Sequence, residues 1–110
     1  MATGIQRNQE MQIFDRQTFI FKAFGNWTRL HILHMLGQHD WGARRLQQEL
    51  VVSRASLSQH VAKLQVAGLF IKQRRGEGLW LSLAFPEVKW AYELIRNVLR
   101  AQIHNDRVFL

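Results

Sequence analysis

The stretch SRASLSQHVAKLQVAGLFIKQRRGEGLWLSL, residues 53–83, changes its hydrophobic period halfway along. Its first half carries an apolar stripe at the three- and four-residue intervals of one helix face, formed by Leu57, Val61 and Leu64. Ser53 is a residue type preferred at a helix N-cap, and Gly68 is typical of the position just past a helix end. The pattern therefore predicts a helix from about residue 54 to residue 67.

The second half of the stretch consists of two runs rich in aromatic and branched residues, 69–75 and 79–83. They flank the loop Gly76-Glu77-Gly78, and a short glycine-containing loop between two such runs predicts a β-hairpin. A hairpin that directly follows a short amphipathic helix is typical of the wing of a winged helix-turn-helix. Residues 69–83 are therefore predicted to form a wing.

A shorter helix is predicted just upstream, over 43–50, because Leu46 and Leu50 are four residues apart and share one face. The dipeptide Val51-Val52 is too short to be a strand between two helices. We interpret it as the turn of a helix-turn-helix that spans residues 43–67.

The rest of the chain predicts further helices around this unit. The expected segments are a disordered start at 1–8, helices at 9–24, 27–36 and 86–104, and a turn at 39–42. In the second helix, Leu30, Leu33 and Leu36 are expected to face the core, and Gly37 to end the helix. The predicted fold class is mainly α with a small β-hairpin: one winged helix-turn-helix domain, residues 1–110, in the order α-α-α-α-β-β-α.

The net charge is +7 with neutral histidines, and the excess lies in the middle of the chain. Residues 41–84 hold seven of the fifteen basic residues but only two of the eight acidic residues. A basic patch of this kind is the electrostatic signature of a polyanionic partner such as a nucleic acid. A merely solvated basic surface is the alternative on charge alone.

The polar face of the predicted helix at 54–67 carries residue types that contact DNA bases. A helix-turn-helix lays its second helix in the major groove, while the preceding helix lies against phosphates. Gln pairs bidentately with adenine, and small Ser side chains permit close approach. Sequence selection is therefore expected from Ser56, Ser58 and Gln59, with His60 at the edge of the apolar stripe. An amphipathic helix facing only water is the alternative, and the basic hairpin that follows argues against it.

Basic residues around this helix are predicted to contact phosphates. Because Lys72 and Arg74 share one strand face and Arg75 lies on the other, at most two of the three are expected to touch DNA. We expect loss of Arg75 to weaken binding to every duplex. The full predicted DNA-binding set is Arg44, Arg45, Arg54, Ser56, Ser58, Gln59, His60, Lys63, Lys72, Arg74 and Arg75.

Two stretches resemble signature sequences of the ArsR family of winged-helix repressors. Residues 21–36 read FKAFGNWTRLHILHML, which is similar to the family's ALxNPTRLxIL. Residues 53–68 read SRASLSQHVAKLQVAG, which is similar to SQSTVSQHLxxLxxAGL. Trp27 stands where the family usually has proline, which should alter packing at the start of its helix without touching the predicted recognition helix.

The resemblance implies a homodimer that pairs its first and last helices and binds a two-fold operator. The apolar residues of 9–24 and 86–104 also cover more than one helix face, which is more than a helix on its own core needs. Both helices wrapping the core is the alternative. The predicted dimer-interface residues are Phe14, Phe21, Tyr92, Ile95 and Leu99.

The family often senses metals, but this chain offers few ligands. It contains no cysteine, which excludes thiolate sites. The acidic and histidine residues near the chain end lack the close pairing of the family's other metal site: Glu87, Glu93, His104 and Asp106. His31 and His34 are three apart but have no evident third ligand. We predict no metal and no cofactor, with a metal-sensing repressor using His and carboxylate ligands as the alternative.

Other functional classes find little support. The sequence lacks a phosphate-binding loop and a nucleophile elbow, so no enzyme is predicted. It also lacks a long apolar run and a signal-peptide pattern, which favours the cytoplasm. The predicted function is a sequence-specific transcriptional regulator, most simply a repressor, with double-stranded DNA and a second copy of the chain as partners. A non-specific architectural or protein-binding winged helix is the alternative, and any effector is left open.

Overall fold

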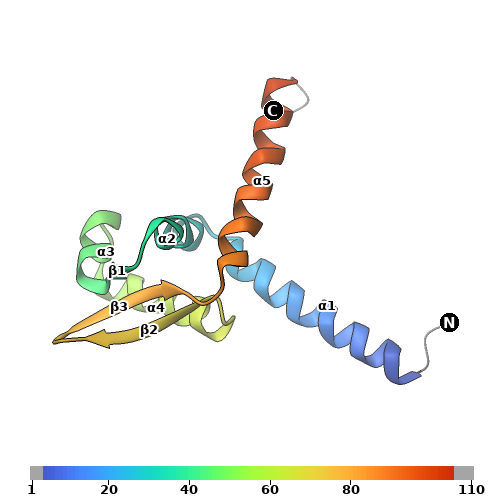
Figure 1. The fold of residues 1–110 in the computed structure, drawn as a ribbon, viewed down its shortest axis with the longest axis horizontal. Helices are drawn as coiled ribbons and strands as arrows, with labels where there is room; N and C mark the ends of the chain where they lie inside the picture. The colour runs from blue at the N-terminus through green and yellow to red at the C-terminus, as the bar shows by residue number, and fades with distance from the viewer. Residues whose placement is uncertain (1–3, 106–110) are drawn as a thin grey trace.

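The computed structural model describes residues 4–105, which form five helices and a three-stranded sheet. In chain order the elements are α1 (Gly4–Phe24), α2 (Trp27–Gln38), β1 (Trp41–Gly42), α3 (Ala43–Leu50), α4 (Arg54–Val66), β2 (Phe70–Arg75), β3 (Gly78–Leu83) and α5 (Pro86–His104). The predicted winged helix-turn-helix is confirmed: α3 and α4 form the helix-turn-helix, and β2 with β3 forms the wing. Figure 1 shows these elements gathered in one body, from which α1 and α5 project as separate arms.

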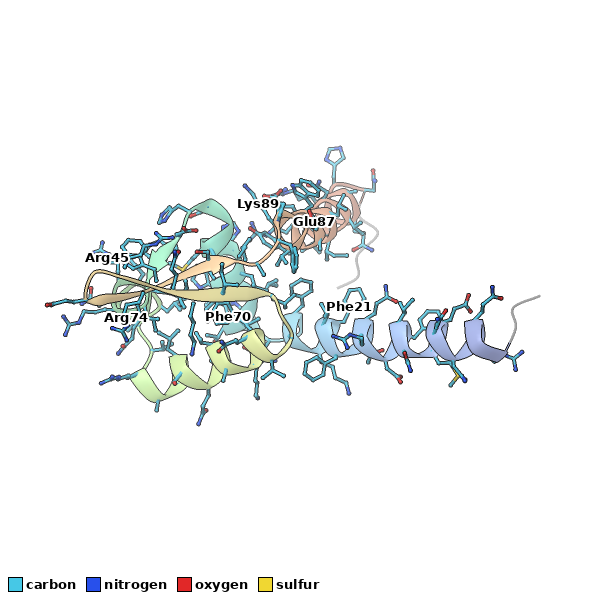
Figure 2. The ribbon with its side chains drawn as sticks, turned by 60° about the horizontal axis from the view of Figure 1, so that its bottom comes forward. Phe21, Arg45, Phe70, Arg74, Glu87 and Lys89 are labelled. Atoms are coloured by element: carbon cyan, nitrogen blue, oxygen red, sulfur yellow. The ribbon has the colours of Figure 1, made fainter. Side chains whose placement is uncertain are left out.

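The core of the body lies between α2, α3, α4 and the sheet. Its fully buried side chains come from each of these parts: Ile32, Leu33, Leu46, Leu64 and Leu81. Figure 2 shows Phe70 at the start of the wing, between β2 and α4. The predicted stripe of α4 is confirmed, since Leu57, Val61 and Leu64 are all buried. This packing fixes α4 by one face and leaves its opposite face to solvent.

Local caps set the limits of α4, the predicted recognition helix. The Ser53 hydroxyl accepts a hydrogen bond from the Ser56 backbone N–H at 3.0 Å, so Ser53 is the N-cap that the sequence predicts. Gly68 has a φ of +74°, a conformation that favours glycine just past a helix end. Between α3 and α4, Val51 adopts the left-handed conformation at φ 53°, which is strained for a β-branched residue. This residue makes the tight turn of the helix-turn-helix.

The sheet has the order β1-β3-β2, with both pairs antiparallel. The prediction of a turn at 39–42 is wrong in part, because Trp41 and Gly42 pair with Leu81 and Trp80 as the third strand. The Trp41 indole N–H donates to the carbonyl of Met35 at 3.0 Å, which helps to hold the short strand in place. The pairing partners of the strand lie 40 and 38 residues further along the chain, so the strand leaves no local signal in the sequence.

Several predicted boundaries need correction. α1 begins at Gly4, so residues 4–8 are helical; residues 1–3 of the segment expected to be disordered lie outside the described residues. α2 continues through Gly37, where an added Cβ would collide with the Tyr92 hydroxyl. Glycine is thus present to let α5 pack closely rather than to end the helix. Leu30, expected in the core, is exposed, whereas Leu33 and Leu36 are buried as predicted.

Candidate nucleic-acid interface

The outward face of α4 is polar and basic because its apolar stripe is turned inward. Arg54, Ser58, Gln59 and Lys63 are exposed, and Ser56 is half-buried in the first turn beside its cap. No acidic residue occurs in α4. The helix therefore presents hydrogen-bonding and positively charged groups, starting from its N-terminal end, where backbone N–H groups also favour anions.

A groove of about 680 Å³ separates α4 from the wing. Its floor is apolar, formed by Leu57, Val61 and Leu81, and its walls carry charged and polar side chains: Arg44 and Gln47 of α3, Arg54 and Ser58 of α4, and Lys72 and Glu77 of the wing. Three cations thus converge from three elements on one concave surface, together with one carboxylate. The tertiary structure brings together residues that lie up to 38 positions apart in the chain, from Ala43 to Leu81.

The basic residues of the wing are divided between its two faces. Residues that pair across an antiparallel ladder lie on the same face. Lys72 pairs with Leu81 and Arg74 with Leu79, which places both cations on the face that packs toward α4. In Figure 2, Arg74 lies beside the end of the wing, on the same side of β2 as Phe70. The prediction that Lys72 and Arg74 share one strand face is confirmed.

Arg75 lies on the opposite face of the wing and is held there. Its Nη2 donates to the Asp40 carboxylate at 2.6 Å, and its Nε and Nη2 donate to the Gln73 side-chain oxygen at 3.3 and 3.2 Å. The guanidinium also stacks over the Trp80 ring, 5.0 Å from its centroid. The hydrogen bond from Arg75 lowers the pKa of Asp40 by more than burial raises it, and a weaker contribution from Ser82 also lowers it, so the carboxylate is charged at neutral pH.

His60 is turned toward the body rather than fully outward. Its Nδ1 lies 3.4 Å from Nη1 of Arg29, a buried residue of α2. Arg29 also donates through Nε to the carbonyl of Ala23 at 2.8 Å and through Nη2 to that of Lys22 at 3.2 Å. Arg29 therefore joins the end of α1 to α4. Burial, followed by the charges of Arg29 and Lys63, lowers the pKa of His60.

Arg45 differs from its neighbour Arg44. It is exposed on α3 and forms an ion pair with Glu49 one turn later, with 2.9 Å between Nη2 and Oε1. Arg45 does not line the groove between α4 and the wing, whereas Arg44 does. Of the predicted DNA-binding residues, Arg44, Arg54, Ser58 and Lys72 line the groove. Arg45, His60 and Arg75 instead contact other side chains of the same chain.

The predicted dimer residues separate into two groups. Phe14 and Phe21 of α1 and Ile95 and Leu99 of α5 are exposed. Tyr92, by contrast, is buried in its own subunit, where its hydroxyl donates to the carbonyl of His34 at 3.4 Å. Its inclusion in the interface needs correction, because close packing of α5 on α2 encloses the ring.

The arms carry more exposed apolar side chains than the prediction named. The large ones are Met11, Ile13 and Phe19 on α1 and Trp90, Leu94, Val98 and Ile103 on α5.

Two residues that sequence reasoning missed are polar: Asp40, which binds Arg75, and Arg29, which binds His60. Neither had a local signal, because both partners are distant in the chain.

Within residues 4–105, no three His, Cys, Asp or Glu residues are grouped so as to hold a metal ion. Asp106, considered above as a ligand, lies outside the described residues. His31 packs edge-on against Trp27, and His34 against Tyr92. Burial, followed by the charge of Arg96, lowers the pKa of His34. Across the same described range, no helix is long and apolar enough to cross a membrane.

Comparisons with known proteins find clear relatives, although no family model matches the sequence. The chain is 33% identical over 79 residues to the transcriptional activator HlyU of Vibrio cholerae, covering 72% of this chain and 73% of HlyU. It is 29% identical over 89 residues to Rv0081 of Mycobacterium tuberculosis, an uncharacterized HTH-type transcriptional regulator, covering 80% and 77% of the two chains.

Solved structures agree with these relatives. The structure of HlyU from Vibrio cholerae matches with a TM-score of 0.70 at 31% identity, covering 76% of this chain and 91% of that one. The homodimeric winged helix-turn-helix DNA-binding domain Mb0332 from Mycobacterium bovis matches with a TM-score of 0.86 over 98% of this chain and 100% of that one. At 19% identity, the second likeness concerns the fold alone.

Proposed function

Because this chain belongs to the ArsR family of winged helix-turn-helix transcriptional regulators, we propose that it binds a two-fold operator as a homodimer and represses transcription from it. The observation that carries the proposal is the groove between α4 and the wing, where cations from α3, α4 and β2 flank the polar face of a capped helix. A B-form major groove admits one α-helix, and α4 presents a polar and basic face without acidic residues to solvent.

Sequence selection is assigned to the first turns of α4. Ser58 and Gln59 are exposed there, and the buried stripe fixes the helix, so the backbone that carries these side chains needs little ordering when they bind. Gln59 can accept from and donate to adenine N6 and N7, and Ser56 and Ser58 can hydrogen-bond to most base edges at close range. His60 takes a lesser part, because it is turned toward Arg29.

Phosphate binding is assigned to the unpaired cations around the groove. Arg44, Arg54 and Lys72 line it, Lys63 is exposed further along α4, and Arg74 lies on the wing face that points the same way. Contacts of this kind position a protein on a duplex without selecting its sequence. They also release counterions, so affinity should fall steeply as salt rises.

Dimer formation is assigned to the arms. α1 and α5 together expose many large apolar side chains, which a lone subunit in water would leave uncovered. The related fold of Mb0332 is described as homodimeric, which supports the same assembly for this chain. A two-fold dimer would place two copies of α4 on successive major grooves, so a palindromic site is expected.

Selection of bound duplexes from a random pool tests the proposal directly. The expected result is an inverted repeat whose half-sites are centred about 10 base pairs, or a multiple of that, apart. Recovery of unrelated sequences with no preference over random duplex would overturn sequence-specific binding and favour an architectural role.

A reporter placed behind the selected site then tests the direction of control. Repression predicts higher expression when the protein is removed, because a dimer seated on a promoter blocks the polymerase. Lower expression on removal would overturn the repressor assignment and match the activator name of HlyU.

A further inference from the structure

The Asp40–Arg75 ion pair crosses the whole sheet. Asp40 directly precedes β1 at one edge, and Arg75 ends β2 at the other edge, 35 residues later in the chain. Between them runs β3, whose Trp80 lies beneath the Arg75 guanidinium. The pair therefore ties the outer end of the wing to the strand next to the body. No backbone ladder makes this connection, because β1 and β2 pair only with β3.

The chemistry of Arg75 on this face differs from that of Arg74. Both side chains are exposed, but Arg75 has a carboxylate, an amide oxygen and an aromatic ring as partners, whereas Arg74 lies on the face toward α4. For Arg75 to bind a phosphate, it would have to leave a charged carboxylate whose own charge repels the phosphate. Hydrogen bonds from Arg75 and Ser82 lower the pKa of Asp40, so the carboxylate stays charged at neutral pH and opposes the release of Arg75.

We propose that Arg75 is a positioning residue rather than a phosphate contact: its latch to Asp40 fixes the angle of the wing so that Lys72 and Arg74 reach the DNA backbone. This inference rests on the proposed DNA-binding function and revises the role that the sequence suggested for Arg75. It gives Asp40, an acidic residue paired with Arg75 on the wing face opposite the groove, an indirect part in binding.

Three single variants distinguish the two roles by sign. If the latch is correct, Arg75→Ala and Asp40→Asn both weaken operator binding several-fold, since each frees the wing. If Arg75 instead binds phosphate, Asp40→Asn should tighten binding, because it releases the cation and removes a repelling charge. Arg74→Ala is the positive control and should lower the slope of log K against log salt by about 0.9. Tighter binding by Asp40→Asn would overturn the proposal.

Combined variants add a test that a general loss of charge cannot imitate. In the Asp40→Asn background, Arg75→Ala should have little further effect, because the latch is already open. The exchange Asp40→Arg with Arg75→Asp restores an ion pair across β3 and should recover most of the lost affinity. Failure of this exchange, together with additive effects of the single variants, would count against the latch.

Hydrogen exchange on the free protein tests the latch without DNA. Amides of β2 and β3 should exchange faster in Asp40→Asn and Arg75→Ala than in the unsubstituted protein. Glu49→Gln, which breaks the exposed Arg45–Glu49 pair within α3, is the matched control and should leave the wing unchanged. Unchanged wing exchange in both latch variants would overturn the proposal. If the unsubstituted protein binds no duplex, the proposed function fails, while the exchange result still decides the latch.

Discussion

The body and the two arms of this protein differ in how much of their apolar side-chain surface is buried. In the body, α2, α3, α4 and the sheet build one buried apolar core, although single large apolar side chains such as Leu30 and Val66 are exposed and Arg29 is buried. In the arms, α1 and the outer part of α5 expose side chains such as Phe14, Phe21 and Ile95. The contrast shows that the body has a core of its own, whereas the arms carry apolar surface that a single chain leaves exposed.

The largest expected effect comes from breaking the body. Leu64 of α4 is fully buried, and Leu64→Ala should lower the free energy of unfolding by about 2–5 kcal/mol, because it removes buried methyl groups and leaves a cavity. Val66→Ala, two residues on and 73% exposed, is the matched control, with an expected change within about 0.5 kcal/mol. Urea unfolding at fixed protein concentration measures both. Equal losses for the two variants would contradict the separation of body and surface.

The next effect comes from charging an arm. Ile95→Glu with Leu99→Glu places two carboxylates among exposed apolar groups of α5 and should yield a folded monomer. Loss of the second half-site contact should weaken operator binding by about 100-fold or more. Sedimentation and a binding titration measure the two outcomes. Gln102→Glu, an exposed polar position on the same helix, should preserve the dimer; a dimer that survives the double substitution would remove the arms from the interface.

A smaller effect is expected on the polar face of the body. Gln59→Ala should cost about 1–3 kcal/mol of discrimination between the operator and a random duplex, because one bidentate base contact is lost. Binding to random duplex should change little. Gln65→Ala, exposed near the far end of α4, is the control and should keep the full specificity ratio. If Gln59→Ala weakens both duplexes equally, Gln59 contacts the backbone and not a base.

The smallest effect concerns the junction between body and arm at His60. Burial and the charge of Arg29 hold the pKa of His60 below its ordinary value of about 6.5. Below about pH 6.5, His60 takes up a proton more readily in the unfolded chain than in the folded chain. The free energy of unfolding therefore keeps its full value above that pH and falls as the pH drops toward the folded-state pKa. His60→Gln should flatten this part of the profile, measured as urea unfolding at pH 7.5 and pH 5.5. An unchanged difference between the two pH values would assign the pH dependence to other groups.

The recognition helix and the wing were predictable because their signals are local. A cap at Ser53, an apolar stripe of period 3.6 and a glycine past the helix end describe α4 almost to the residue. The errors occur where local patterns compete with tertiary packing. Gly37 resembles a helix end in sequence, but it lies within α2 because Tyr92 needs the space.

The same distinction divides the candidate site. Alternation along β2 is a local property, and it correctly separated Lys72 and Arg74 from Arg75. The partner of Arg75 on its own face is not set by local sequence, because the pairing of β1 with β3 brings Asp40 there. The sequence shows how many cations the wing carries, but it does not show that the Asp40 carboxylate already pairs with one of them, Arg75.

The sequence alone determined the order of the helices and the hairpin, the inward stripe of α4, the polar face beside it and the basic excess in the middle of the chain, since each depends on spacing or composition. Only the tertiary structure decided that Tyr92 belongs to the core, that Arg29 joins His60, and that Arg75 is bound to Asp40. These contacts join residues 31 to 58 positions apart. Their partners are chosen by the packing of whole helices and strands, which no short window of sequence contains.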